Sequence, residues 1–353
     1  MGNLQTYNGA VAWRGPEVAA SSDWSHRFTP SEVAALAAAA DKVTGREIVS
    51  LRAADFDLCA LDPVLAKIRA DLTEGRGFAL LRGLPVDDWP IARTARAYWA
   101  ICSHVGQPIA QNQVGNLLGH VIDVGGDSRH PNQRAHQSND GLAFHSDIGA
   151  EYVALLCLRT ARSGGKSYLV SAAALWNELV ATQPDLAETL TERFHLDRRG
   201  EMVDGQNPWF TIPVFVCTAK RLFATYNPRF VYSAQRFLEL PRLTGQQKKA
   251  LEAVMTLANK PAFKLAMDFQ PGDIQLINNH RLLHSRAAFE DWPNPSRRRH
   301  LLRIWLCVPD GDPIPDTLYN RFGADAETGR PKGTSLPPGV SFTTPLEPPA
   351  LRT

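Results

Sequence analysis

Short apolar or alternating segments, each followed by a turn signal, recur along the chain from about residue 118 to residue 310. Many short strands at this spacing are typical of a β-sandwich or jelly roll. The predicted strands cover 118–124, 152–158, 167–171, 210–216, 221–226, 263–268, 273–278 and 300–308. This pattern predicts a mainly β domain with flanking helices.

Helices are expected on both sides of and within this region. Residues 29–32 (Thr-Pro-Ser-Glu) combine a threonine N-cap with proline at the first helical position, which predicts a helix over the following alanine-rich run. Further helices are expected near 62–74, 90–104, 172–194 and 245–259. Residues 1–30 are expected to form an irregular arm, and the proline-rich residues 323–353 an extended surface tail. One domain is therefore expected over 31–322.

Charge and cysteine content narrow the class of protein. The 38 basic residues against 36 acidic ones give a net charge of +2, too balanced to argue for nucleic acid or an anionic membrane as partner. Five cysteines without a CxxC pair predict reduced thiols rather than a disulfide framework or zinc knuckle. No segment approaches the ~20 apolar residues of a membrane span, and no signal peptide is indicated. We expect a cytoplasmic protein that acts on a small molecule. The sequence does not decide whether the protein forms a homo-oligomer.

Residues 144–147 (Phe-His-Ser-Asp) place an imidazole and a carboxylate two positions apart. In a strand, His145 and Asp147 would point to the same side. One histidine and one carboxylate supply two of the three ligands of a facial triad, which is typical of non-haem iron(II). Alone the pattern is weak, because roughly one such pair is expected by chance among 10 histidines and 36 acids.

A second pair of this kind, His195 and Asp197, differs from the first in its surroundings. His145 follows an irregular polar stretch and precedes the predicted strand 152–158, so we expect it at the mouth of a sheet. His195 follows a predicted helix and precedes a polar Arg-Arg-Gly segment. We interpret His195 as a surface histidine at a helix end.

The third metal ligand must come from a distant segment. The candidates are His280 and His284, which follow the predicted strand 273–278. In the last predicted strand, Arg299 and Arg303 are four residues apart and would face the same side. Two arginines directed into an apolar barrel are costly unless they meet anions. The sequence therefore predicts an anion site near the metal.

The ordered set of these motifs resembles the taurine dioxygenase / 2,4-dichlorophenoxyacetate dioxygenase family, part of the clavaminate synthase-like oxygenases. The set comprises His145-x-Asp147, the Pro271-Gly272-Asp273 turn, His284, and arginines 15 and 19 positions after it. Residues 155–167, with the sequence Gly164-Gly165, are also similar to that family's strand and Gly-Gly turn. The resemblance covers residues 75–310 and implies a double-stranded β-helix (jelly-roll) core.

The resemblance implies roles for the matching residues. His145, Asp147 and His284 match the family's iron ligands. Arg299 matches the arginine that pairs with the distal carboxylate of 2-oxoglutarate, a task suited to a bidentate guanidinium. Ser167 falls where the family has a hydroxyl residue beside the same carboxylate. The implied cofactors are Fe(II), 2-oxoglutarate as cosubstrate, and O₂.

The substrate end is less defined by the resemblance. Arg303 matches a position that holds an anionic substrate group in several family members. Gln111, Gln113 and the loop 134–139 are further candidate contacts. The expected reaction is hydroxylation of a small, anionic molecule, an amino acid or carboxylate, with release of succinate and CO₂.

Two other classes of protein fit parts of the pattern. One is a jelly-roll metalloprotein that does not use 2-oxoglutarate, such as a cupin-like dioxygenase or a hydrolase. The other is a non-catalytic protein that binds a small molecule. The first class gives Arg299 and Ser167 no role, and the second would not need a metal.

Overall fold

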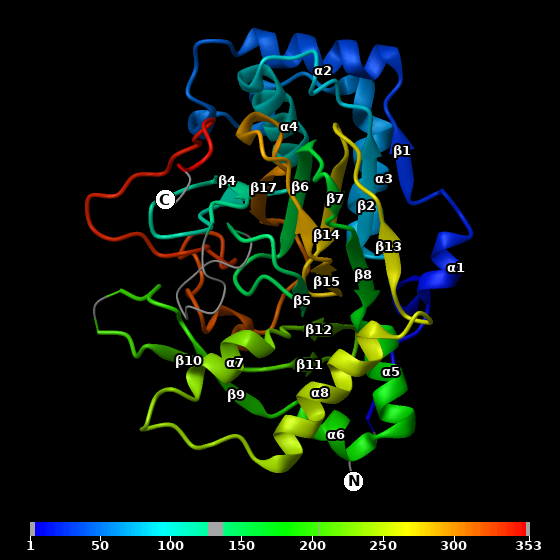
Figure 1. The fold of residues 1–353 in the computed structure, drawn as a ribbon, viewed down its shortest axis with the longest axis vertical. Helices are drawn as coiled ribbons and strands as arrows, with labels where there is room; N and C mark the ends of the chain where they lie inside the picture. The colour runs from blue at the N-terminus through cyan, green and yellow to red at the C-terminus, as the bar shows by residue number, and fades with distance from the viewer. Residues whose placement is uncertain (1–3, 126–136, 204, 351–353) are drawn as a thin grey trace.

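Two β-sheets form the centre of the computed structural model, which describes residues 4–125, 137–203 and 205–350 (Figure 1). The strands are β1 (Ser25–Arg27), β2 (Phe78–Arg82), β3 (Gln107–Ile109), β4 (Leu118–Ile122), β5 (Leu142–His145), β6 (Tyr152–Arg159), β7 (Ser163–Gly164), β8 (Ser167–Ser171), β9 (Arg193–Asp197), β10 (Trp209–Pro213), β11 (Phe215–Cys217), β12 (Leu222–Ala224), β13 (Leu265–Met267), β14 (Ile274–Asn278), β15 (Leu282–Arg286), β16 (Phe289–Glu290) and β17 (His300–Cys307). The helices are α1 (Gly15–Ala19), α2 (Pro30–Lys42), α3 (Asp62–Thr73), α4 (Ile91–Val105), α5 (Ala172–Thr182), α6 (Pro184–Thr189), α7 (Pro228–Ala234) and α8 (Gly245–Asn259).

The larger sheet has seven strands in the order β1-β2-β14-β6-β17-β3, with β4 also paired to β17. Helices α2, α3 and α4 cover one face of this sheet, and Leu302, Ile304 and Leu306 of β17 point into the core between them. Arg303 and Trp305 lie on the opposite face and line a cavity. The alternation expected for the last strand is confirmed, because neighbouring residues of a strand face opposite sides.

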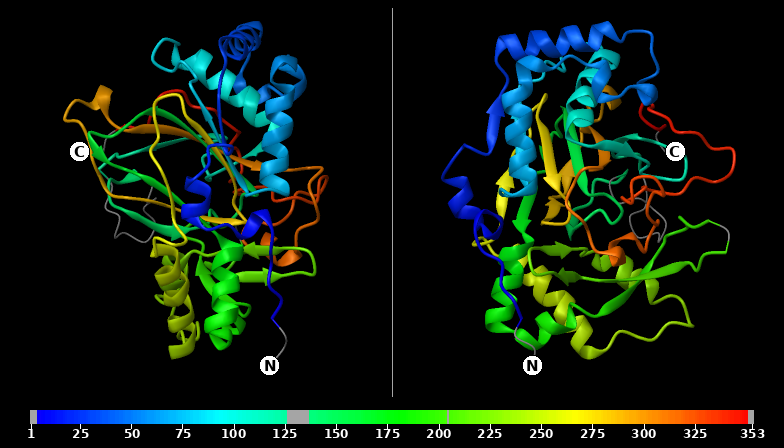
Figure 2. Two further views of the ribbon diagram at one scale, coloured as in Figure 1. Left: turned by 90° about the vertical axis from the view of Figure 1, so that its right-hand side faces the viewer. Right: turned by 180° about the vertical axis from the view of Figure 1, so that it is seen from behind.

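The smaller sheet has four strands in the order β13-β8-β15-β5. A second apolar core joins it to α5, α6 and α8. Figure 2 shows the N-terminal helices (blue to cyan) at one end of the molecule and these later helices (green to yellow) at the other. The two sheets between them form the predicted jelly roll.

Most predicted helices occur where the sequence placed them. The side chain of Thr29 accepts a hydrogen bond from the backbone of Glu32, and Glu32 accepts one from the backbone of Thr29, which closes the N-terminus of α2. The helix predicted over 172–194 is partly wrong, since α6 ends at Thr189 and β9 begins at Arg193.

The error over β9 also corrects the interpretation of His195. Phe194 and Leu196 are buried while His195 is half-buried, an alternation with the period of a strand. Strand β9 pairs with β10, and Trp209 lies opposite Asp197. His195 is therefore a strand residue rather than the end of a helix.

Both ends of the described chain are partly ordered against the larger sheet. The N-terminal arm is not irregular throughout, because β1 pairs in parallel with β2. The proline-rich C-terminal segment is extended and makes isolated β-bridges from Gly333 to Ala110 and from Thr343 to Asn116. No helix of the described residues has both the length and the apolar character needed to cross a membrane.

Candidate active site

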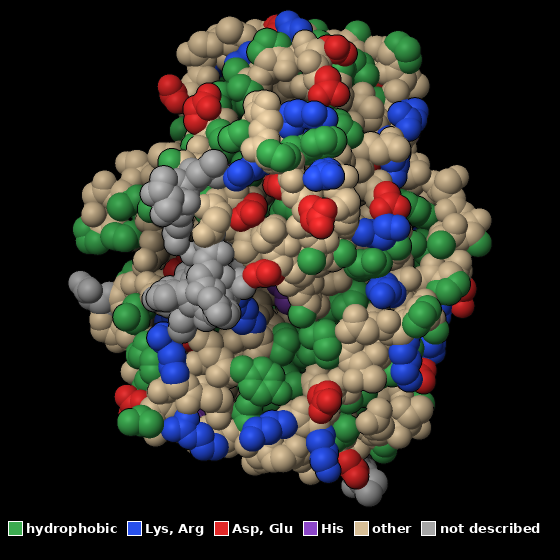
Figure 3. Space-filling model, viewed as in Figure 1, with side chains coloured by type: hydrophobic (Ala, Val, Ile, Leu, Met, Phe, Trp, Pro, Cys, Tyr) green, Lys and Arg blue, Asp and Glu red, His purple; other side chains and the backbone are tan. Residues whose placement is uncertain are grey.

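A cavity of about 370 Å³ lies between the two sheets. Strands β5, β8 and β15 of the smaller sheet and β6, β14 and β17 of the larger sheet contribute its walls. Val121 of β4, the segment just before β5, the turn after β9, the start of α7 and Arg321 also line the cavity. On the face drawn in Figure 3 the surface is hollowed, and histidine and basic side chains are visible in the hollow. A cavity of this size suits a small-molecule site.

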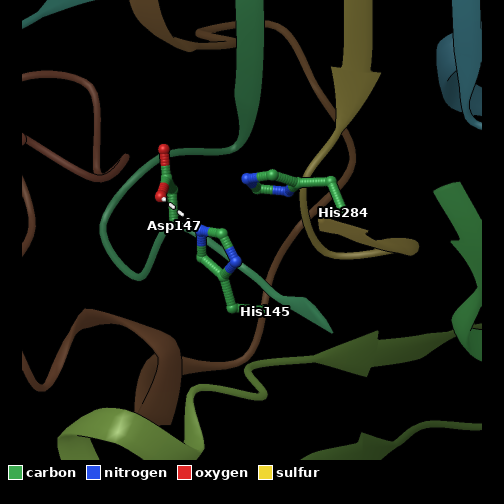
Figure 4. A group of neighbouring side chains, drawn as sticks. All are labelled: His145, Asp147 and His284. Atoms are coloured by element: carbon green, nitrogen blue, oxygen red, sulfur yellow. Dashed lines mark ion pairs between the residues drawn. The ribbon is translucent and has the colours of Figure 1, made fainter. Parts of the chain in front are cut away.

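Two histidines and one aspartate converge in this cavity (Figure 4). His145 ends β5, Asp147 lies in the turn that follows, and His284 lies on the neighbouring β15. The strand register sets His284 opposite His145, and their ring centroids are 4.3 Å apart. One ligand atom from each of the three residues lies within 4.8 Å of the others, and the described part of the chain holds no second group of this kind.

The surroundings of the two imidazoles leave a lone pair on each for a metal ion. The Nδ1–H of His145 donates to the carbonyl oxygen of Ala143 at 2.8 Å, so Nε2 carries the lone pair and lies 3.6 Å from Oδ1 of Asp147. Burial, together with the neighbouring His145, lowers the pKa of His284 to about 3. His284 is therefore neutral near pH 7, the form in which imidazole binds metals.

The carboxylate of Asp147 is anchored through one oxygen only. Its Oδ2 accepts hydrogen bonds from Nη1 of Arg303 at 3.0 Å and from Nε1 of Trp305 at 2.9 Å. Burial raises the pKa of Asp147, but the charge of Arg303 and the contact with His145 outweigh burial and hold this pKa well below its ordinary value. Oδ1 faces the imidazole and is the oxygen placed to bind a metal.

The turn that carries Asp147 is fixed by Asn279, a residue that the sequence did not single out. Oδ1 of Asn279 accepts the backbone N–H of Asp147 at 2.8 Å, and its Nδ2 donates to the carbonyl oxygens of Asp147 and Ala150, both at 2.8 Å. Asn279 is buried, so these bonds satisfy backbone groups that water cannot reach. They fix the direction in which the chain leaves β5.

This donor set fits iron(II). Two imidazoles and one carboxylate are the ligands of the facial triad, which leaves three positions for other ligands. The structure brings together His145, Asp147 and His284, as the sequence predicted. His280, the alternative third ligand, lies outside this cavity, with its ring 5.9 Å from that of Phe223 and its pKa lowered to about 4 by burial.

Two buried arginines form a candidate anion site in the same cavity. The guanidinium carbons of Arg299 and Arg286 lie 5.2 and 4.7 Å from the ring centroid of Phe289. Among the residues that the structure describes, Nη1 of Arg299 and both Nε and Nη1 of Arg286 are buried without a hydrogen-bond partner. Burial lowers the pKa of Arg299, and burial with the charge of Arg299 lowers that of Arg286 to about 9. Such a pair is unfavourable unless it binds an anion.

Ser167 and Gly165 shape this anion site. Ser167 lines the cavity on β8, and the strand register sets it opposite Arg286 of β15. Gly165 has a φ of +71°, and a Cβ at this position would lie 3.2 Å from Nε of Arg299. Glycine is therefore needed both for the backbone conformation and for the space that the guanidinium occupies.

The three residues predicted to contact substrate lie in different places. Arg303 lines the cavity, but its guanidinium is hydrogen bonded to Asp147 and, through Nε, to Oε1 of Gln111 at 2.7 Å. Nε2 of Gln111 donates to the carbonyl oxygen of Arg303 at 2.7 Å, and Gln113 donates to that of Met202 at 2.9 Å. Neither glutamine lines the cavity, so the structure does not bring these two to the site.

The cavity contains further arginines that the sequence did not indicate, namely Arg199, Arg229, Arg286 and Arg321. The position of Arg286 could have been inferred from the sequence, because it lies two residues after His284 on one strand and so faces the same side. Arg199 and Arg321 lie outside helices and strands, and Arg229 lies in the first turn of the short helix α7, where the sequence gives too few residues to establish a period. Of the predicted contact loop 134–139, residues 134–136 lie outside the described residues.

The family described as "Taurine catabolism dioxygenase TauD, TfdA family" matches residues 40–305. FR-33289 synthase of Streptomyces rubellomurinus is 29% identical over 327 residues, which cover 90% of this chain and 95% of the synthase. Taurine hydroxylase-like protein SAT17 of Stachybotrys chartarum is 29% identical over 313 residues, which cover 84% of this chain and 78% of that protein.

A solved structure of an asparagine oxygenase, in complex with Fe(II), 3-hydroxyasparagine and succinate, has a similar fold. The TM-score is 0.61 at 16% sequence identity, and the match covers 80% of this chain and 93% of the oxygenase. At this identity the likeness concerns the fold, and it confirms the predicted double-stranded β-helix core.

Proposed function

Because the chain belongs to the TauD, TfdA family of Fe(II)- and 2-oxoglutarate-dependent oxygenases, we propose that it hydroxylates a small anionic organic molecule. The observation that carries this proposal is the convergence of His145, Asp147 and His284 in a cavity rich in arginine. In the balanced reaction, a substrate C–H bond, 2-oxoglutarate and O₂ give the alcohol, succinate and CO₂. Amino acids and carboxylates are the first substrates to test.

The iron would be held by one nitrogen each of His145 and His284 and by Oδ1 of Asp147. Bound iron(II) supplies the redox chemistry that couples decarboxylation of 2-oxoglutarate to oxidation of the substrate. The protein keeps the imidazoles available as neutral donors and Asp147 ionised. Arg303 and Trp305 hold Oδ2 of Asp147, so we assign Arg303 the role of orienting this ligand.

The distal carboxylate of 2-oxoglutarate is assigned to Arg299 and Ser167, with Arg286 as an additional partner. The buried N–H groups of the two arginines that have no partner among the described residues support this assignment. The carboxylate would satisfy these donors and offset the repulsion between the two guanidinium groups. Leu155 and Leu301, which line the same cavity, exclude water beside it.

Family membership separates this function from the two alternatives that the sequence left open. A cupin-like dioxygenase or hydrolase would not need 2-oxoglutarate, and a binding protein would not need a metal. Both cofactors, Fe(II) and 2-oxoglutarate, are those of the family.

The test is reconstitution with Fe(II) and 2-oxoglutarate without oxygen, followed by a screen of amino acids and small carboxylates in air. The iron–2-oxoacid chelate is expected to give a visible charge-transfer absorption, and at least one compound is expected to stimulate succinate release. An intact, folded protein that forms no chelate and releases no succinate would contradict the proposal.

A further inference from the structure

Three arginines surround Phe230 on the part of the cavity that lies outside the sheets. Arg199 follows β9, Arg229 lies beside Phe230 on α7, and Arg321 lies in the C-terminal segment. The guanidinium carbons of Arg199 and Arg321 lie 5.2 and 4.9 Å from the ring centroid of Phe230. We call these three residues the arginine wall. Segments far apart in sequence thus bring three positive charges to one side of the cavity.

The backbone of Arg199 adopts a conformation that needs support. Its φ is 58°, and no other residue apart from glycine has a positive φ in the described chain. Oδ1 of Asp197 accepts the backbone N–H of Arg199 at 2.7 Å. The same carboxylate, fully buried, accepts a hydrogen bond from Ser233 of α7 and lies 3.0 Å from Nε of Arg236. Asp197 therefore fixes the turn of Arg199 against α7.

Arg321 is held by contacts on its backbone and on its side chain. Arg198 donates to the carbonyl oxygens of Asn320, at 3.1 Å, and of Arg321. The guanidinium of Arg321 donates to the carbonyl oxygen of Ile148 at 2.6 Å and pairs with Glu201 at 2.8 Å. Its Nε is buried with no partner among the described residues. A buried N–H of this kind that lines a cavity points toward an anionic ligand.

The cavity carries more positive charge than iron and 2-oxoglutarate can balance. Its described lining includes six arginines and three carboxylates, an excess of three positive charges. The two charges of iron(II) are matched by the two carboxylates of 2-oxoglutarate, so this excess remains. Arg303 is paired with Asp147, and the 2-oxoglutarate end has its own two arginines. Glu201 offsets one charge of the arginine wall by pairing with Arg321, so the positive excess of the described lining is shared between the wall and the 2-oxoglutarate end.

The like charges at the wall act on the pKa of Arg199, against the opposing charge of Asp197. Burial lowers the pKa of Arg199 to about 10, and the charges of Arg229 and Arg321 add to this effect. An anion bound among the three guanidinium groups would remove the repulsion between them.

We propose that the arginine wall binds a dianionic phosphoryl group of the substrate, in a phosphate monoester or a phosphonate. This inference rests on the proposed function, since it names the substrate class of the same cavity. A phosphoryl group offers three oxygens and two charges to guanidinium groups that approach from three segments. A carboxylate offers two oxygens and one charge, and so matches the arginine wall less well.

Calorimetric titration of the protein loaded with Fe(II) and 2-oxoglutarate, without oxygen, tests this assignment. Methyl phosphate and methylphosphonate are expected to bind at least about tenfold more tightly than acetate or methanesulfonate, which carry one charge. Arg199→Gln and Arg229→Gln are each expected to weaken this binding at least about tenfold. Arg297→Gln, which removes an exposed arginine stacked on Trp292 outside the cavity, is the matched control and is expected to change nothing.

The outcomes separate this inference from the proposed function. Equal affinity for the singly charged probes, or unchanged affinity in both variants, would overturn the arginine wall as a phosphoryl site while the chelate absorption persists. Absence of that absorption in the unmodified protein would instead contradict the proposed function. A thermal melt checks folding, and Arg229→Gln, whose side chain is only half-buried, carries the test if Arg199→Gln is unfolded. Preference for one of the two phosphoryl probes distinguishes an ester from a phosphonate.

Discussion

The two ends of the cavity are built in different ways. At the iron end, the side chains lie on or beside β5, β8, β15 and β17, and strand register decides which of them face one another. At the arginine wall, the side chains come from a turn, a short helix and a C-terminal segment that Asp197 and Arg198 hold together. Metal chemistry needs side chains held within about 0.5 Å, which strands achieve better than loops. The comparison fits the two proposals made above, in which the sheets fix the reaction and the segments outside them select the substrate.

The largest expected effect comes from removing a ligand at the iron end. Removing a residue that only hydrogen bonds to a metal ligand typically lowers metal affinity or activity about 10–100-fold. Asp147→Ala removes a ligand itself, so its losses of iron affinity and of turnover are expected to be larger. The remaining imidazoles lack the anionic donor that completes the set. Iron content after gel filtration and succinate release measure the two losses.

The second His-x-Asp sequence provides the control for this variant. His195→Ala removes a half-buried histidine that does not line the cavity, and it is expected to keep iron and turnover. Retention of stoichiometric iron by Asp147→Ala would mean that the metal is bound elsewhere, and the comparison between the two ends would fail.

The same difference explains which parts of the site could be predicted from the sequence. His145 and Asp147, and also Arg299 and Arg303, are separated by even numbers of residues, so the period of a strand predicts one side for each pair. Asp147 and Arg299 lie just outside β5 and β17 but still line the cavity. The helix predicted through Phe194 failed because the alternation over β9 is only five residues long and follows two real helices. The arginine wall depends on tertiary contacts such as those of Asp197, which no local pattern encodes.

The next largest effect is expected at the 2-oxoglutarate carboxylate. Arg299→Gln and Arg286→Gln are each expected to raise the KM for 2-oxoglutarate about 10–100-fold, since hydrogen bonds to charged groups contribute about 1.5–3 kcal/mol. Both variants should leave the affinity for phosphoryl probes unchanged. Steady-state kinetics with varied 2-oxoglutarate measure the effect, and Arg297→Gln is again the control.

The two arginines are expected to act alike on 2-oxoglutarate, although Arg286 has further contacts. If Arg286→Gln leaves the KM for 2-oxoglutarate unchanged while Arg299→Gln raises it, the pairing of both guanidinium groups with one carboxylate is wrong. Arg286 also donates to the carbonyl oxygens of Ser138 and Asp140, so a thermal melt must show that the variant is folded.

A buried histidine pair, which includes the neighbour of Arg299 in the sequence, is expected to make the free energy of unfolding sensitive to acid. Nε2 of His300 lies 2.7 Å from Nδ1 of His120, whose Nε2 lies 3.0 Å from the carbonyl oxygen of Pro345. Burial and the neighbouring His120 lower the pKa of His300 to about 3, and burial lowers the pKa of His120. The pKa of such a histidine is about 6.5 in the unfolded state and lower in the folded state. The folded state therefore gains stability above pH 6.5, and this stability is lost as the pH falls from about 6.5 toward the pKa of the folded state.

From pH 7 to pH 5, the contribution of His300 to the free energy of unfolding is therefore expected to fall by about 2 kcal/mol. Urea denaturation at several pH values measures this change. His300→Gln should reduce the dependence on pH, whereas His104→Gln, in the last turn of helix α4, should keep it. An equal dependence in both variants would assign the acid sensitivity to other groups.

The smallest expected effects form a matched pair, one at each end of the cavity. Ser167→Ala should raise the KM for 2-oxoglutarate about 2–10-fold, the effect of one hydrogen bond of about 0.5–1.5 kcal/mol. Asp197→Asn keeps an oxygen for the backbone N–H of Arg199 but loses the charge that faces Arg236, and should weaken phosphoryl-probe binding by a similar factor.

Ser167→Ala should leave phosphoryl-probe binding unchanged, and Asp197→Asn should leave the KM for 2-oxoglutarate unchanged. The two residues share no contact and belong to different segments, so their effects should be independent. Kinetics in 2-oxoglutarate and calorimetry with methyl phosphate are therefore measured on both variants. If Asp197→Asn raises the KM for 2-oxoglutarate as much as Ser167→Ala does, the loops and the sheets are coupled. Substrate choice could then not change independently of the iron chemistry.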